Sequence, residues 1–528
     1  MNKSKINFKD DNLLILSLIL FSFIISFSYP YLQYGVDGGL ILADQIKYPN
    51  NKSPMLFYFL NSWTLIHQIS YLFVKVGISV ENISKILMFI STTSFIFGVL
   101  LFSYSITNIK SISCLISITA IVLGKNFGDT DYPSLIFSEH TYGMMSLAIF
   151  TLCLGLLANR NVLFACVALV TSIAIHPIIG IWAITVSFLG FYFSNIYKYY
   201  KKDIKTGVLI GVSLAIISFI FFYFNSIEKV NYDQNLFSIY LDKWDGHRAI
   251  SKNIHFDYLI KTFFLGILSY AFLKDKNNIK YNNLNCHILV LLISLFISTL
   301  LYLSFKLFPN YFSELIKILM PSRFIMLHTF LGWPLIISFL FFFISRKFNQ
   351  KKLIKILSIF LIIILFQNYK KIIMLSNNFL DNFHQSETSK IILYIENKDF
   401  DGYILTSSNL TSLIFKKAKK PILLHTDSMD FIPYHPYLVN KFFNIMERVY
   451  GIENFLPPDR NNPSLSDEYV KFIFEKSSKD HWIKIKNEFE IEYIITPKKW
   501  ILNLETIMQD DQYKLYKIYN FFFILSIT

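Results

Sequence analysis

Long apolar runs separated by short polar joints dominate the chain up to about Phe366. A helix needs about 20 apolar residues to cross the hydrocarbon core of a bilayer, so the pattern predicts about eleven membrane spans. The expected span cores are Leu13–Phe27, Ile86–Ile106, Ser113–Gly124, Gly143–Leu157, Val162–Ile179, Ile181–Ile196, Gly207–Phe224, Tyr258–Phe272, His287–Phe305, Phe324–Ile344 and Leu353–Phe366.

The first apolar run follows three lysines and therefore has the charge pattern of a signal peptide. A cleavable signal also needs small residues after the run, whereas Ser28, Tyr29, Pro30 and Tyr31 stand there. We therefore expect an uncleaved first span.

One further apolar segment, Ser53–Gly77, contains Asn61, Trp63, His67 and Gln68. Whether this segment crosses the membrane decides the topology, because cytoplasmic joints carry an excess of Lys and Arg. If it is an interfacial helix on the outer face and the N-terminus is cytoplasmic, the basic joints all fall inside the cell. These joints hold Lys110, Arg160, Lys198, Lys201, Lys202, Lys205, Lys274, Lys276, Lys280, Arg346, Lys347, Lys351 and Lys352.

The pattern changes beyond Thr388, where short strand-like runs alternate with amphipathic helical stretches. We expect a membrane domain over residues 1–375 and a small α/β domain over residues 386–528. An odd number of spans places the second domain outside the cytoplasm. The expected strands are Tyr403–Thr406, Pro421–His425, Tyr493–Thr496 and Tyr513–Ile518.

Composition supports a membrane protein, and we expect it in a bacterial inner membrane. Hydrophobic residues make up 53% and charged residues 16% of the chain, against about 25% charged residues in soluble proteins. The net charge of +14 lies mostly in the joints, so we interpret it as a topology signal and expect no nucleic-acid partner. The four cysteines form no CxxC pair, and no nucleotide-binding or common hydrolase motif occurs.

Asp37 and Asp44 follow the first span and are the candidate catalytic residues. A carboxylate at this position can accept the proton of an acceptor hydroxyl during group transfer. Either residue can equally be a solvated loop carboxylate or a helix cap.

Polar residues near the expected outer ends of other spans are candidate substrate ligands. Glu139 and His140 precede the fourth span, and His176 stands before Pro177 inside an apolar stretch. A histidine there needs a partner or a cavity, and proline frees backbone carbonyls. These residues fit either a head-group site or interfacial flanks and a capped kink.

A second group of candidate ligands lies further along the chain. Trp244, Asp245, His247 and Arg248 form a dense polar group in which tryptophan can stack on a sugar or anchor a loop. Arg323 opens the tenth span, where its planar guanidinium can hold a phosphate or extend to the interface.

A metal site has weaker support in the sequence. His425, Asp427, Asp430 and His435 lie close together, but their spacing matches no standard zinc pattern. We assign no metal ligand, and dependence on a divalent metal stays open.

The layout resembles the GT-C glycosyltransferases, such as protein O-mannosyltransferases and aminoarabinose transferases. The resemblance lies in one span, an outer loop bearing Asp37, then Pro54-Met55-Leu56 before an interfacial helix and Gly77-Ile78-Ser79 before the second span. Lys52-Ser53-Pro54 replaces the usual Pro-Pro, and the expected membrane domain, residues 1–375, contains no clean Asp-Glu pair. Ile175-His176-Pro177 and the C-terminal region are closer to a less characterised group of bacterial membrane proteins.

The resemblance implies a polyprenyl-phosphate sugar as donor and a reaction centre near Asp37. The expected activity is therefore transfer of a sugar from this lipid to an envelope glycan or protein on the outer side of the membrane. Two alternatives remain open, namely a transporter or flippase for lipid-linked glycan and a non-enzymatic envelope assembly protein.

Overall fold

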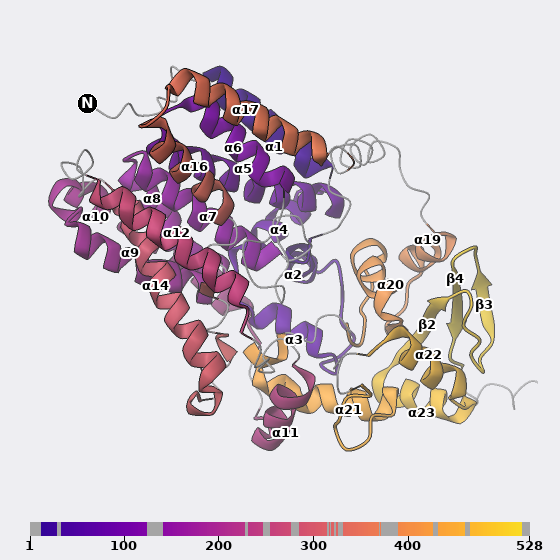
Figure 1. The fold of residues 1–528 in the computed structure, drawn as a ribbon. Helices are drawn as coiled ribbons and strands as arrows, with labels where there is room; N and C mark the ends of the chain where they lie inside the picture. Colours follow the sequence, from indigo (N-terminus) through magenta and orange to yellow (C-terminus); the bar gives the residue numbers. More distant parts are fainter. Residues whose placement is uncertain are drawn as a thin grey trace, which may run out of the picture.

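The structure is a computed structural model of the chain (Figure 1). It describes residues 12–28, 33–123, 141–227, 231–245, 254–275, 285–313, 316, 318–320, 324–325, 331–368, 370, 389–425, 431–459 and 465–519.

The described chain is mostly helical, and five of its helices are long and apolar enough to cross a membrane. They are α5 (Val80–Thr107), α9 (Pro177–Ser194), α10 (Tyr197–Asn225), α12 (Phe256–Lys274) and α14 (Cys286–Leu307). Shorter or more basic helices fill the other expected span positions. They are α1 (Asn12–Phe27), α6 (Lys110–Leu123), α7 (Thr141–Ala158), α8 (Val162–Ile175), α16 (Gly332–Ser345) and α17 (Gln350–Gln367). The membrane character is thus supported, while the count of about eleven spans stays a prediction.

The expected fifth span extended to Ile179, but α8 ends at Ile175 and α9 begins at Pro177. Proline has no N–H and a fixed φ, so it suits the first turn of a new helix better than a helix interior. The expected single interfacial helix is also divided, into α3 (Pro54–Asn61) and α4 (Leu65–Lys75). Helix α4 has its own cap, because the Thr64 hydroxyl accepts a hydrogen bond from the Ile66 N–H at 3.3 Å.

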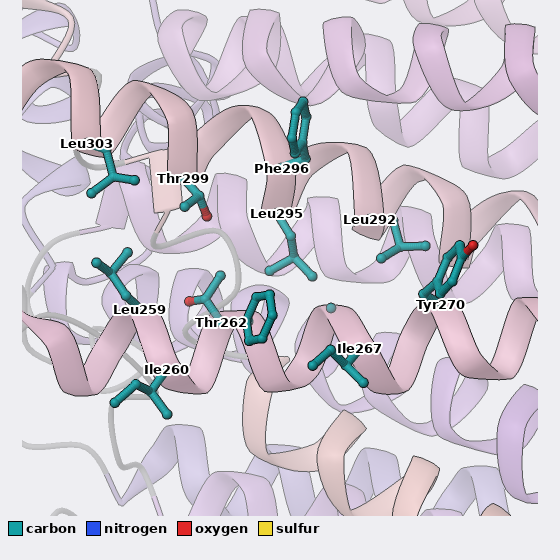
Figure 2. Close-up of a pocket in the computed structure, with 12 residues that line it drawn as sticks. Leu259, Ile260, Thr262, Ile267, Tyr270, Leu292, Leu295, Phe296, Thr299 and Leu303 are labelled. Atoms are coloured by element: carbon teal, nitrogen blue, oxygen red, sulfur yellow. The ribbon is translucent and has the colours of Figure 1, made fainter.

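Helices α12 and α14 run beside each other in opposite directions, with apolar side chains between them (Figure 2). Helix α10 lies at the side of the bundle and exposes much of its length. Its apolar residues Leu209, Ile217 and Phe224 are 67%, 64% and 79% exposed. Such a surface is costly in water and suits a lipid environment.

The C-terminal unit, defined here as residues 389–519, contains a four-stranded sheet with the order β1-β2-β4-β3. Strands β1 (Tyr403–Thr406) and β2 (Ile491–Pro497) are parallel, and β4 (Tyr513–Lys517) is antiparallel to both β2 and β3 (Thr506–Gln509). The helices of this unit are α19 (Lys390–Asn397), α20 (Ser408–Leu413), η6 (Ile414–Ala418), η8 (Pro436–Leu438), α21 (Val439–Tyr450), α22 (Asp467–Lys476) and α23 (Lys479–Phe489).

Three of the four expected strands are confirmed. The fourth, Pro421–His425, is wrong as a strand, because it makes only an isolated bridge between Ile422 and Ile404. Strand β3 was missed because it lies at the sheet edge and is mostly exposed, so it lacks an apolar alternation. The predicted boundary between the two domains, residues 375–386, lies outside the described residues.

The first loop, defined as residues 33–79, holds α2 (Gly35–Leu42), α3 and α4 and packs directly onto the C-terminal unit. Val36, Met55 and Phe59 belong to the same buried cluster as the sheet residues Ile404 and Ile494. A second cluster lies among the bundle helices. The first loop therefore joins the bundle to the C-terminal unit (Figure 1). The candidate residue Asp37 lies in this junction, because it pairs with Lys416 of the C-terminal unit.

Candidate functional site

Two glycines set the position of Asp37 by letting helix α2 approach helix α4 closely. A Cβ atom on Gly38 would overlap the His67 ring, and one on Gly39 would lie 2.8 Å from the Tyr71 backbone nitrogen. The Ser70 hydroxyl also donates a hydrogen bond to the Gly35 carbonyl at 3.1 Å. This close packing fixes the short helix that carries Asp37.

Asp37 forms a buried ion pair with Lys416 of the C-terminal unit. The Lys416 Nζ lies 3.7 Å from the Asp37 Oδ1, and the two side chains are 0% and 5% exposed. The same ammonium lies 4.7 Å from the centre of the Tyr34 ring. Burial of a single charge is very costly, so each of these two groups offsets the cost of burying the other.

His425 lies beside this ion pair and is itself buried. Burial, together with the positive charge of Lys416, lowers the pKa of His425 from 6.5 to about 3. The imidazole is therefore neutral at neutral pH. Among the described residues, its buried Nδ1 has no hydrogen-bond partner.

A second histidine, His67, lies in helix α4 and packs against Gly38, the residue that follows Asp37. Burial lowers its pKa to about 3. Its Nε2 lies 2.8 Å from the Tyr142 hydroxyl, and this hydroxyl donates a hydrogen bond to the Tyr34 carbonyl at 3.4 Å. Asp37 thus has the Lys416 ammonium beside it, and burial together with the charge of Asp37 raises the pKa of the nearby Tyr48 and Tyr58 phenols.

Asp44 stands apart from the ion pair, in an exposed turn after helix α2 with a φ of 57°. It lines a cavity of about 620 Å³ together with Lys47, Tyr48 and the last residues of helix α10, Phe224 and Asn225. We call this cavity the Asp44 hollow.

Tyr48 connects the hollow with the ion pair. Burial raises the pKa of its phenol, and the nearby Tyr403 and Asp37 raise it further. Tyr48 is therefore close to both predicted carboxylates, of which Asp37 is buried and Asp44 is exposed.

His176 caps helix α9. Its Nδ1 accepts a hydrogen bond from the Ile179 N–H at 3.4 Å. The Thr64 hydroxyl donates to the Ile175 carbonyl at 2.9 Å, which provides a partner near the proline break. These contacts account for a histidine at this point in an apolar stretch, and its assignment as a substrate ligand stays a prediction.

Trp244 ends the π-helical turn η2 (Tyr240–Trp244), which follows α11 (Gln234–Ile239). Its ring is buried and packs edge-on against Phe442, and its Nε1 donates to the Phe455 carbonyl at 2.8 Å. The indole thus anchors the loop after α10 to the C-terminal unit, and a sugar can stack on it only after this contact opens. The neighbouring Asp245 is also buried.

The remaining predicted ligands, Glu139, His140, His247, Arg248 and Arg323, lie outside the described residues. The structure instead adds Lys416, His425, Lys47 and Tyr48 to the candidate site. Sequence reasoning missed Lys416 because it stands in a short basic run with Lys417, Lys419 and Lys420. Such a run is usually a solvated face, and nothing in it signals that one lysine pairs with a residue nearly 400 positions away.

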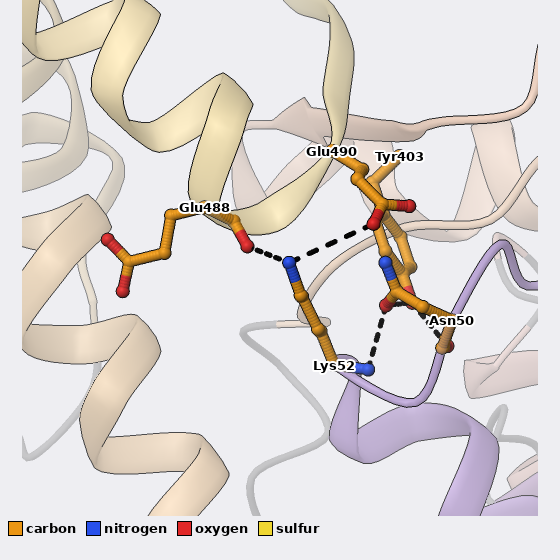
Figure 3. A network of polar contacts seen from close by, with 5 residues as sticks. All are labelled: Asn50, Lys52, Tyr403, Glu488 and Glu490. Atoms are coloured by element: carbon orange, nitrogen blue, oxygen red, sulfur yellow. Dashed lines mark hydrogen bonds and ion pairs between the residues drawn. The ribbon is translucent and has the colours of Figure 1, made fainter.

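A polar junction beside the site also joins the first loop to the C-terminal unit (Figure 3). The Lys52 ammonium donates to the Glu488 carbonyl and lies 3.8 Å from the Glu490 carboxylate. The Tyr403 hydroxyl donates to the Asn50 carbonyl at 2.9 Å. Lys52 thus has a docking role here, in the segment Lys52-Ser53-Pro54 that stands where the resemblance expects Pro-Pro.

Within the described part of the chain, no group of three or more His, Cys, Asp or Glu residues is placed to hold a metal ion. Two residues of the suggested metal site, Asp427 and Asp430, lie outside the described residues. His435 instead lies 3.1 Å from the Ser62 hydroxyl and 2.9 Å from the Tyr437 hydroxyl.

In comparisons with known proteins, no family model matches this chain, and no curated protein does.

Proposed function

We propose that this protein is an integral-membrane glycosyltransferase that moves a sugar from a polyprenyl phosphate to an envelope acceptor. The proposed location is the outer side of a bacterial inner membrane, with a cytoplasmic N-terminus. The observation that carries the proposal is the Asp37 carboxylate, which is buried and fixed 3.7 Å from Lys416 where the membrane bundle meets the C-terminal unit.

In this proposal Asp37 acts as the general base. It takes the proton of the acceptor hydroxyl as the acceptor oxygen forms a bond to the anomeric carbon of the sugar. The bond between that carbon and the phosphate oxygen breaks, and the lipid phosphate leaves with the electron pair. Attack from the opposite face inverts the anomeric centre. Lys416 is a positioning residue, because it holds the carboxylate in place until the acceptor enters.

The Asp44 hollow supports entry of a lipid-linked donor. It is bounded by Phe224, at the end of a helix whose apolar surface suits lipid, and it contains the cation of Lys47. A polyprenyl chain can thus lie along the bundle while its phosphate approaches Lys47. Arg248 and Arg323 stay the other proposed phosphate contacts.

The C-terminal unit supports the proposal as the acceptor-side cover of the site. It supplies Lys416 and His425 to the surroundings of Asp37. Acceptor access requires Lys416 to move from Asp37, so acceptor binding and opening of this contact are coupled in the proposed cycle.

A non-enzymatic envelope assembly protein is the second candidate. The specific observation in its favour is that the ion pair is fully covered, because a covered pair can fasten two parts of a protein without meeting a substrate. Asp37 is then a structural residue, and its role depends only on Lys416.

The test compares lipid-linked sugars and envelope glycans, by mass spectrometry, in wild-type, deletion and variant cells. Loss of a general base lowers the rate about 10²–10⁴-fold, so Asp37→Asn and the deletion should lose the same sugar while its lipid-linked donor accumulates. Asp242→Asn is the matched control, since it removes an exposed carboxylate from η2.

Folding and chemistry are separated by the double variant Asp37→Asn/Lys416→Met, which leaves no unpaired charge at this site. If it reaches wild-type levels in the membrane and still lacks transfer, the chemical role of Asp37 is supported. Wild-type glycans in this double variant, with glycans lost in the deletion, would remove Asp37 from catalysis. An unchanged profile in the deletion would favour the assembly protein.

A further inference from the structure

An apolar groove of about 630 Å³ lies between helices α12 and α14 (Figure 2). Its volume falls within the range of about 300–1,000 Å³ that is typical of ligand pockets. Phe263 and Phe296 beside it are 71% and 66% exposed. Both helices are long and apolar enough to cross a membrane, so hydrocarbon is the environment that suits this surface.

Gly266 creates the space in the middle of the groove. A Cβ atom added to this glycine would meet no atom within 4 Å. The groove extends from Leu259 and Leu303 at one end to Tyr270 and Leu292 at the other. At 1.5 Å per residue, the length from Leu292 to Leu303 is about 16 Å, which is roughly half of a bilayer core.

A cation stands at one end of the groove. Lys274 follows Tyr270 by one helical turn, and its Nζ lies 5.1 Å from the centre of the Tyr270 ring, which lines the groove. The lysine side chain is exposed. The basic joints of the sequence predict that this end faces the cytoplasm, where anionic lipids give the membrane surface a negative potential.

We propose that this groove binds one acyl chain of an anionic glycerophospholipid whose phosphate headgroup lies against Lys274. The length of the groove matches a chain within one leaflet, and the lysine supplies the charge that distinguishes an anionic from a zwitterionic headgroup. This site is separate from Asp37 and does not depend on the proposed glycosyl transfer.

Native mass spectrometry of the purified full chain tests the proposal. The protein is titrated with phosphatidylglycerol and with phosphatidylcholine of identical acyl chains. We expect one phosphatidylglycerol to be retained about fivefold more strongly than phosphatidylcholine, as expected for one lysine near a charged headgroup.

Two variants and a matched control locate the site. A Cβ atom on Gly266 meets no atom within 4 Å, so Gly266→Leu places its side chain in the groove and should abolish retention of both lipids. Lys274→Gln should remove only the preference for the anionic lipid. Lys201→Gln is the control, because Lys201 lies over the Tyr197 ring at 6.0 Å in the same one-turn arrangement on helix α10. Size-exclusion profiles verify that each variant is folded.

Three results would overturn the proposal. The first is wild-type retention by Gly266→Leu, and the second is equal loss of preference in Lys274→Gln and Lys201→Gln. The third is loss of the preference in Lys306→Gln instead, since Lys306 lies one turn beyond Leu303 at the opposite end.

Discussion

The ion pair between Asp37 and Lys416 allows a quantitative test of how the C-terminal unit is held to the bundle. At the observed separation of 3.7 Å, two unit charges attract each other by about 4.5 kcal/mol if the effective dielectric constant is about 20. Removal of one partner from a buried pair typically costs about 3–5 kcal/mol, because the other charge stays buried. We therefore expect Asp37→Asn and Lys416→Met each to lower the free energy of unfolding by about 3–5 kcal/mol.

The double variant should lose much less than the sum of the two single variants, because it buries no unpaired charge at this site. The resulting coupling free energy should be about 3–4 kcal/mol, measured by equilibrium unfolding of the four proteins in mixed detergent micelles. The pair Lys52–Glu490 is a matched control. Its separation is 3.8 Å, but its side chains are 39% and 47% exposed, so its coupling should be at most about 1 kcal/mol.

Additive losses in the Asp37–Lys416 cycle would refute this reasoning. A coupling no larger than that of the Lys52–Glu490 control would do the same, because burial is the physical difference between the two pairs. Either result would mean that water or another polar group screens the Asp37 carboxylate.

Three other perturbations follow from the same structure. The pKa of His425 is about 3 in the folded protein and 6.5 when exposed, so the unfolded state binds more protons between these values and stability falls as pH drops through this window. In acid unfolding curves, His425→Phe should therefore reduce the slope of unfolding free energy against pH by up to about 1.4 kcal/mol per pH unit. Replacement of the partly exposed His481 by Gln should change this slope less. Gly39→Ala must displace the backbone of helix α4 and should lower the stability of the protein in thermal unfolding by about 1–3 kcal/mol. Gly266→Ala meets open space and should raise it by up to about 1 kcal/mol. Equal effects of the two variants would contradict the packing argument. Trp244→Phe keeps an aromatic ring but loses the hydrogen bond to a backbone carbonyl, so it should cost about 1 kcal/mol in denaturant unfolding, and no loss would mean that this bond does not hold the loop.

Local sequence patterns predicted those helices and strands whose apolar and polar positions alternate regularly along the chain. Tyr403–Thr406 is a strand as expected, and Trp482, Ile485 and Phe489 form the buried face of a helix. The edge strand Thr506–Gln509 escaped because an exposed edge shows no alternation. The break between helices α3 and α4 at Ser62–Thr64 was not predicted, because a helix cap needs only one hydroxyl and an apolar helix can also contain one.

Of the candidate site, the sequence drew attention to Asp37 and Asp44 through their place after the first span, and it left open whether either is more than a loop carboxylate. Nothing in the local pattern distinguished them. The structure does so, since Asp37 is buried against Lys416 while Asp44 is exposed in a hollow with Lys47.

The sequence by itself determined the membrane character, most helix positions and the presence of a C-terminal α/β region, because hydrophobic length and periodicity are properties of contiguous residues. Only the tertiary structure decided that the first loop and the C-terminal unit share one buried cluster, and that Lys416 is the cation beside Asp37. Contacts between residues hundreds of positions apart depend on how whole elements pack. The partner of each side chain at this junction depends on the three-dimensional packing, so no local spacing in the sequence predicts the pairing.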